Sequence, residues 1–75
     1  MKELVLFLAK ALVDHPDDVS VEPVEEGGVV KLMLKVSEED KGKIIGKQGK
    51  VIKAIRSLLS AEAARSNKKV FLEIA

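Results

Sequence analysis

A four-residue loop with glycine at both ends, Gly46-Lys47-Gln48-Gly49, separates two apolar stretches of the chain. Ile44-Ile45 precede the loop and Val51-Ile52 follow it. Glycine is common where helices end, because it adopts backbone conformations that other residues avoid. We therefore predict a helix of about one to two turns before the loop and one of about four to five turns after it.

Two further segments, residues 29–36 and 70–74, show the two-residue period of a β-strand with one buried face. Their predicted inward side chains are Val30, Leu32, Leu34, Val36, Val70, Leu72 and Ile74. A third strand is expected at Val19–Glu25, at a sheet edge because Pro23 has no N–H. Glu26-Gly27-Gly28 then forms a hairpin turn between this strand and the next.

Three helices are expected from the remaining apolar segments. The first covers Lys2–Asp14 and is stopped by Pro16. The second covers Ser37–Ile45, with the Ser37 hydroxyl accepting a backbone N–H as an N-cap. The third covers Lys50–Ser66, after the glycine loop.

The order of elements is therefore helix, strand, strand, helix, helix, strand, in a single domain of residues 1–75. The two helices that join the second strand to the last favour a right-handed crossover and parallel pairing. We predict an α/β (α+β) two-layer sandwich, with three helices on one face of a three-stranded mixed sheet. With 75 residues and no cysteine, the chain lacks disulfides and a thiolate zinc site, so self-association is expected to help stabilise it.

Basic residues gather around the glycine loop. Residues 41–56 contain six basic side chains and no acidic one, whereas residues 14–39 are mostly acidic, so the net charge of +1 conceals a segregated surface. Glycines let a phosphate approach the loop N–H groups, and Lys47, Lys50 and the N-terminus of the following helix add positive charge. The pattern favours a clamp for nucleic-acid phosphates. The structural alternative is a corner that only reverses the chain direction.

The loop and its flanks also match a known family signature. Residues 44–52, IIGKQGKVI, fit the I-I-G-x-x-G-x-x-I pattern of the KH domain at every fixed position. The order of elements resembles the type II, prokaryotic KH arrangement, and the likeness to small stand-alone bacterial KH proteins covers the whole chain. The resemblance implies binding of single-stranded RNA, a role as an RNA chaperone or post-transcriptional regulator, a homodimer, and pairing with a larger KH-containing protein.

The same resemblance implies roles for individual residues. Those that would contact the RNA backbone are Gly46, Lys47, Gln48 and Gly49. Ile45 and Ile52 would line the groove in which about four bases lie. The flanking lysines that would lie near phosphates are Lys43, Lys50 and Lys53. Arg56 lies further along the helix and is expected to point elsewhere.

The last helix has more apolar surface than one sheet face covers. Its apolar residues are Val51, Ile52, Ala54, Ile55, Leu58, Leu59, Ala61 and Ala63. In one interpretation they contact neighbouring helices of the same chain. In the other, Leu58 and Ala61 meet a second copy or a KH domain of another protein in a symmetric contact. A protein-interaction module with RNA binding secondary is therefore the alternative function.

Residue spacing argues against other chemistries. Residues 42–47 resemble a P-loop, but three residues rather than four separate the glycines, and Gln48 stands where Ser or Thr is required. His15 lies among aspartates, yet a single histidine at a helix exit makes a poor metal site, and no catalytic triad can be built around it. We expect no enzymatic activity, no metal and no cofactor.

The apolar segment Leu4–Val13 is too short to span a bilayer, and its flanks do not fit a signal peptide, so a cytoplasmic location is expected. Phe7 and Phe71 are the only aromatic residues. We expect Phe7 in the helical core or an interface and Phe71 on the outer face of the sheet. Without an aromatic platform, RNA recognition is expected to have modest affinity and loose sequence preference.

Overall fold

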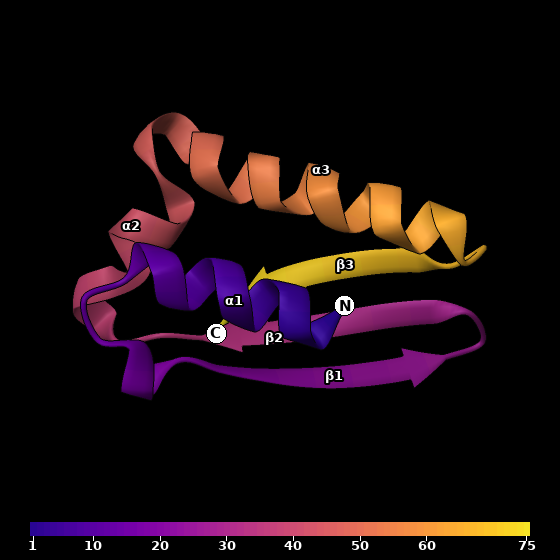
Figure 1. Ribbon diagram of the computed structural model, residues 1–75, viewed down its shortest axis with the longest axis horizontal. Coiled ribbons are helices and arrows are strands. Elements are labelled where there is room, and N and C mark those ends of the chain that lie inside the picture. Colours follow the sequence, from indigo (N-terminus) through magenta and orange to yellow (C-terminus); the bar gives the residue numbers. More distant parts are fainter.

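The computed structural model describes residues 1–75 as two layers, a three-stranded sheet and the helices that cover it (Figure 1). The elements are α1 (Lys2–Leu12), β1 (Ser20–Glu26), β2 (Val29–Lys35), α2 (Lys41–Ile45), α3 (Lys50–Arg65) and β3 (Lys69–Ile74). Short 3-10 turns occur at Pro16–Asp18, Glu38–Asp40 and Lys47–Gly49. Helices α1 and α3 lie over the same face of the sheet, and α2 packs against both at one end of the molecule. The predicted order of elements is confirmed.

The sheet has the strand order β1-β2-β3, so β2 is central and the other two strands are edges. Strands β1 and β2 pair antiparallel, whereas β2 and β3 pair in parallel with Leu32 opposite Leu72. The crossover between the parallel strands runs through α2, the glycine loop and α3. The predicted mixed sheet and its pairing are therefore confirmed.

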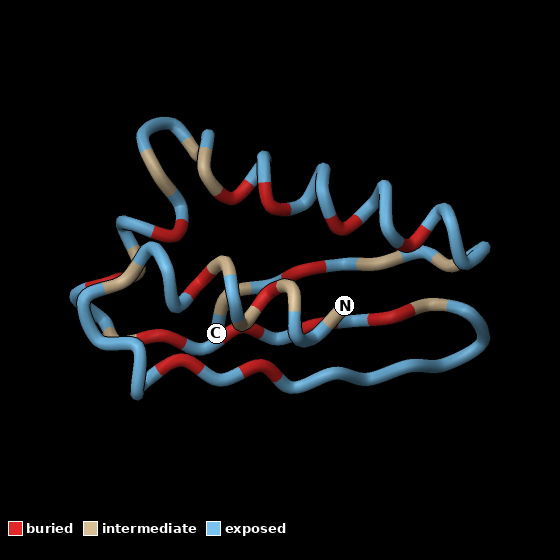
Figure 2. Tube along the Cα trace, viewed as in Figure 1, coloured by how far each residue is buried: buried red, intermediate tan, exposed pale blue.

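The core lies between the sheet and the helices, where the buried residues of α1 and α3 face the sheet (Figure 2). Its fully or nearly fully buried side chains include Val5, Ala9, Val30, Leu32, Leu34, Val36, Ile44, Ile55, Leu59 and Leu72. The alternation along β2 was therefore predicted in the correct phase. Burial of each large aliphatic side chain contributes about 1.5–3 kcal/mol, which makes this cluster the main source of stability.

Two predicted helix boundaries are wrong for a shared reason. Helix α1 ends at Leu12 rather than Asp14, and the predicted Ser37–Ile45 helix is split into a 3-10 turn and the five-residue α2. The Ser37 hydroxyl caps no backbone N–H but donates to the carboxylate of Asp40. That carboxylate also accepts the N–H groups just after α1. A contact between distant segments thus replaces two local helix ends.

The two aromatic side chains lie at the surface. Phe71 is on the outer face of the sheet, as predicted, and is 52% exposed. Phe7 is 71% exposed on α1, so the expected place in the core is wrong, and an interface is the remaining expectation. The wide apolar arc of α1 exceeds what the sheet covers.

Candidate nucleic-acid interface

The glycine loop has a backbone that depends on both of its glycines. Gly46 has φ 77° and ψ 173°, a region that only glycine commonly occupies. A Cβ at this position would collide with the side chain and the backbone nitrogen of Val51, so a side chain is also excluded by space. Gly49 has φ 75° and ψ 15°, the left-handed helical conformation, and a Cβ there would have no neighbour closer than 3.9 Å. Gly46 thus lets the loop backbone pack against Val51, and Gly49 lets the chain turn into α3.

Between the glycines the chain makes one tight turn. The N–H of Gly49 donates to the carbonyl of Gly46 at 3.1 Å, and Gln48 has a positive φ of 57°. A left-handed backbone is uncommon for a residue other than glycine, and such conformations cluster at functional sites. Helix α3 starts directly after the turn, and no side chain caps its N-terminus. The free N–H groups and the helix dipole therefore give this end a partial positive charge.

Three lysines surround the loop without a partner in the chain. Lys47, Lys50 and Lys53 are exposed, and none of the ion pairs of the protein includes them. Lys43 differs, because its ammonium group donates to the carboxylate of Asp14, and this hydrogen bond raises the pKa of Lys43. An anion at the loop meets three unneutralised positive charges and one that is already paired.

The isoleucines that flank the loop have different environments. Ile45 is 41% exposed and lies beside the loop, where it can contact a ligand. Ile52 is 6% exposed and packs in the hydrophobic core, so the expectation that it lines a groove for bases is wrong. The helical phase of α3 turns Ile52 inward together with Ile55 and Leu59. Ile52 therefore anchors the start of α3 in the core and leaves no exposed surface for a base.

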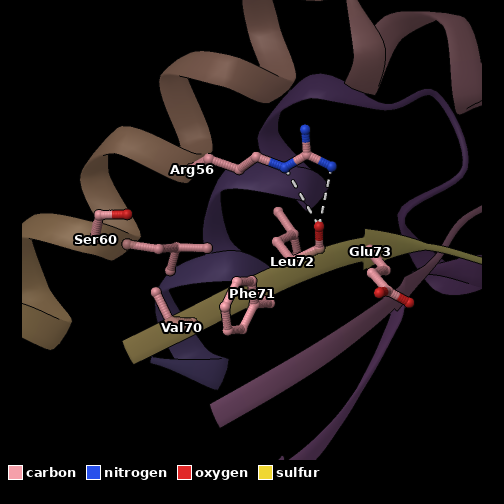
Figure 3. A pocket seen from close by; sticks show the side chains of 7 residues that line it. Arg56, Ser60, Val70, Phe71, Leu72 and Glu73 are labelled. Carbon is pink, nitrogen blue, oxygen red and sulfur yellow. Dashed lines mark hydrogen bonds between the residues drawn. The ribbon is translucent and has the colours of Figure 1, made fainter. Parts of the chain in front are cut away.

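A groove that the sequence did not indicate lies between α3 and β3 (Figure 3). It has a volume of about 300 Å³ and is lined by Arg56, Leu59, Ser60, Val70, Phe71, Leu72 and Glu73. Arg56 points toward β3, and its Nε and Nη2 donate to the carbonyl of Leu72 at 3.3 and 3.1 Å. This carbonyl faces the free edge of β3. The N–H of Leu72 faces the same way, because both groups of one residue point to one side of a strand.

The groove and the glycine loop lie along one flank of α3. Lys53, Arg56 and Ser60 are spaced three and four residues apart and therefore share a helix face. Lys53 lies in the first turn of α3, four residues after Gly49, and the other two line the groove. An extended polymer bound at the loop can thus continue along this flank and meet the polar edge of β3. In the sequence, this groove could have been found from two features together: an edge strand and an arginine two turns into α3.

The predicted partner surface is exposed. Leu58 is 52% exposed, and Ala61 is exposed as well, whereas Ile55, Leu59 and Ala63 form the buried side of α3. The interpretation in which Leu58 is covered by helices of its own chain is therefore wrong.

His15 takes part in no metal-binding arrangement. The chain has no group of three or more His, Cys, Asp or Glu side chains placed to hold a metal ion. The ring Nε2 of His15 instead lies 3.1 Å from Oε2 of Glu39, and this hydrogen bond raises the pKa of His15. None of the helices has the length and apolar character needed to cross a bilayer.

Comparisons with known proteins agree with this geometry. The family described as "KhpA/KhpB, KH domain" matches residues 2–74. A protein of Clostridium perfringens named RNA-binding protein KhpA is 55% identical over 74 residues, which cover 99% of each chain. A protein of the same name from Listeria monocytogenes is 49% identical, over 99% of this chain and 97% of its own.

Two solved structures of the protein Era contain a similar fold. Era of Aquifex aeolicus, in a Y63A variant bound to GDP and AlF4⁻, aligns with 97% of this chain at 27% identity and a TM-score of 0.68. Era in complex with MgGDPNP and nucleotides 1506–1542 of 16S ribosomal RNA aligns with a TM-score of 0.62, also at 27% identity. This chain corresponds to only 28% of each Era chain, so the similarity concerns one part of Era.

Proposed function

Because this chain belongs to the KhpA/KhpB family of KH domains, a non-enzymatic family, we propose that it binds single-stranded RNA by gripping the sugar-phosphate backbone at Gly46–Gly49. Curated relatives of similar length are named RNA-binding proteins. An Era structure with the same fold contains ribosomal RNA.

The observation that carries the proposal is the bare, positively charged face of the glycine loop. A phosphate can approach the backbone at Gly49 because no side chain covers it, and the uncapped N-terminus of α3 points its dipole toward the same place. Lys47 and Lys50 add full charges that no carboxylate of the chain neutralises. Binding at this loop is therefore electrostatic and independent of base sequence.

Bases attached to the clamped backbone lie along the flank of α3 toward β3. Ile45 offers apolar contact beside the loop, and the groove at Arg56 and Leu72 offers hydrogen-bonding groups further along. Phe71 is the one aromatic side chain that lines this groove. Recognition therefore uses mainly aliphatic contact and hydrogen bonds rather than a platform of several aromatic rings, which favours modest affinity.

The test is a titration of a fluorescently labelled single-stranded RNA with wild type and with the double variant Lys47→Asp/Gln48→Asp. Aspartate tolerates the left-handed backbone at position 48, so the fold is retained while the carboxylates repel phosphates. We expect the affinity to fall by at least about tenfold, since like charges placed opposite each other cost several kcal/mol.

The matched control is Lys31→Glu/Lys35→Gln, which changes the net charge equally on the outer face of the sheet. It should bind RNA nearly as well as wild type. Equal binding by wild type and the loop variant would remove the clamp from the proposal.

The proposed assembly is a homodimer formed through α3, with Leu58 and Ala61 at a symmetric helix contact. Replacing Leu58 by Glu should yield monomers in size-exclusion chromatography. Val24→Glu is a matched control, because Val24 is exposed to a similar extent, 57% against 52%, but lies on β1. An unchanged elution volume for the Leu58 variant would exclude α3 from the interface.

The family also favours a heterodimer with the larger KH-containing protein KhpB, also called Jag or EloR. We propose that the chain acts in the cytoplasm as an RNA chaperone or post-transcriptional regulator. The second candidate function, a docking module for that partner, is favoured by the exposed apolar side of α3. Retention of partner binding by the Lys47→Asp/Gln48→Asp variant, without RNA binding, would separate the two activities.

A further inference from the structure

Asp40 is the one charged residue that the fold buries, with 1% of its surface exposed. A buried carboxylate is unfavourable unless hydrogen bonds replace the lost water. Its position is also unusual. Asp40 stands at the N-cap of α2, yet its carboxylate caps no N–H of that helix. The side chain therefore has a role outside its own helix.

The carboxylate of Asp40 joins two segments that are far apart in the sequence. Oδ1 accepts the N–H of Asp14 at 3.1 Å, and Oδ2 accepts the N–H of His15 at 2.9 Å. Oδ2 also accepts the hydroxyl of Ser37 at 3.0 Å. Burial alone would raise the pKa of Asp40, but these donors outweigh it and lower the pKa, so the group stays ionised at neutral pH.

Two side-chain contacts run beside this buried connection. His15 hydrogen-bonds to Glu39 at 3.1 Å, and Lys43 is paired with Asp14. The segment that follows α1 is thereby attached to the 3-10 turn before α2 and to α2 itself. We call this set of contacts among residues 14–15, 37, 39–40 and 43 the brace.

Helix α2 depends on external support. It has five residues, far fewer than the roughly 12–15 that an isolated helix needs to be even marginally stable in water. Its chain runs from Asp40 directly into Gly46, so its two ends are the brace and the glycine loop. Ile44 fixes one side of α2 in the core. Asp40 fixes its start, and the five residues of α2 separate Asp40 from the loop.

We infer that Asp40 is a positioning residue for the RNA clamp: its buried bonds to Asp14, His15 and Ser37 hold α2 so that the glycine loop faces the phosphates. The inference deepens the proposed function and rests on it. Asp40 thereby contributes to the affinity for RNA, although it lies outside the loop and does not contact RNA. It also gives the α1–β1 connection a role in binding.

The test compares Asp40→Asn with Glu22→Gln, which removes the same charge from an exposed residue of β1 that lies outside the brace and makes no ion pair. An asparagine amide has the same shape but places N–H donors against the N–H of Asp14 or His15. RNA affinity is measured well below the unfolding temperature, where circular dichroism shows both variants folded. We expect Asp40→Asn to bind about tenfold more weakly, because a loosely held site loses hydrogen-bond geometry, and Glu22→Gln to stay within about twofold.

A merely structural role gives a different result. It would lower the unfolding temperature of Asp40→Asn but leave the affinity of the folded molecules unchanged, and that outcome overturns the inference. Should Asp40→Asn fail to fold, Ser37→Ala removes one donor of the three, and unchanged RNA affinity in that variant overturns the inference equally.

Amide hydrogen exchange separates this inference from the proposed function, because it needs no RNA. We expect faster exchange at residues 46–49 in Asp40→Asn, with β2 unchanged; equal exchange at the loop contradicts the positioning role. Failure of wild type to bind any single-stranded RNA would instead defeat the proposed function and leave the exchange result to decide whether Asp40 holds the loop.

Discussion

Two glycine turns lie at opposite ends of the molecule and use glycine for different reasons (Figure 1). In the hairpin, Gly27 and Gly28 have φ 58° and 80°, and a Cβ on either would meet nothing within 4 Å. In the loop before α3, Gly46 also has a positive φ, but a Cβ would collide with Val51. The hairpin glycines supply a backbone conformation only. Gly46 supplies the conformation and the close packing that fixes the loop on α3.

The surroundings of the two turns differ as well. Next to the hairpin, Glu25 pairs with Lys68 at 2.8 Å, so charges there are balanced. At the glycine loop, Lys47 and Lys50 have no acidic partner. The brace at Asp40 fixes the start of α2, the helix that leads into this loop. A positive-φ glycine therefore indicates function only when its neighbours are also arranged for a ligand.

The largest contrast is expected between Gly46→Ala and Gly28→Ala. The first adds a side chain to a region reserved for glycine and forces Val51 aside, so we expect a loss of about 3 kcal/mol or more in the free energy of unfolding. The second only requires alanine to adopt a left-handed backbone, which costs about 1–2 kcal/mol. Urea unfolding of both variants measures the difference. Similar losses would show that packing against Val51 is not what distinguishes the turns.

Gly49→Asn sharpens the comparison within the loop. Asparagine tolerates the left-handed conformation of Gly49, and the nearest atoms to a new Cβ are 3.9 Å away. We expect a loss of less than about 1 kcal/mol in stability, because asparagine is among the residues least strained in this conformation and no clash is introduced. RNA binding should weaken more than stability does, since the new side chain covers the backbone that a phosphate approaches. Wild-type affinity in this variant would show that the bare backbone at Gly49 is not used.

The smallest effect is expected from His15, whose folded-state pKa lies above its ordinary value of 6.5 chiefly because of the hydrogen bond to Glu39. A raised pKa in the folded state stabilises the protein below pH 6.5, and this stabilisation is lost as the pH rises through the folded pKa. Stability should thus decline slightly as the pH rises above 6.5 in wild type and not in His15→Ala. An identical pH profile in both proteins would remove this contact from the brace. The hairpin end has no histidine and should not contribute.

Much of the fold could be predicted from local patterns. The alternation along residues 29–36 identified the buried face of β2, and the paired glycines identified the break between α2 and α3. The side of α3 on which Ile52 lies was harder to predict. The family signature includes Ile52 but does not state that this side chain points into the core. The element order could be derived because each strand and helix carries its own period.

What could not be predicted depends on contacts between distant residues. Asp40 and His15 are 25 positions apart, and nothing in either local sequence indicates that one accepts a hydrogen bond from the other. The groove at Arg56 and Leu72 likewise requires knowledge that β3 is an edge strand with a free carbonyl. The lysines and glycines of the loop were predictable as a group, whereas the pairing of Lys43 with Asp14 was not.

The most direct test of the clamp is an NMR titration of the isotopically labelled protein with a short single-stranded RNA. The amide signals of residues 46–50 should shift most, those near Leu72 should follow, and those of Gly27 and Gly28 should stay in place. Shifts centred on the hairpin or on the outer face of the sheet, with the loop unaffected, would contradict the assignment of the RNA clamp to Gly46–Gly49.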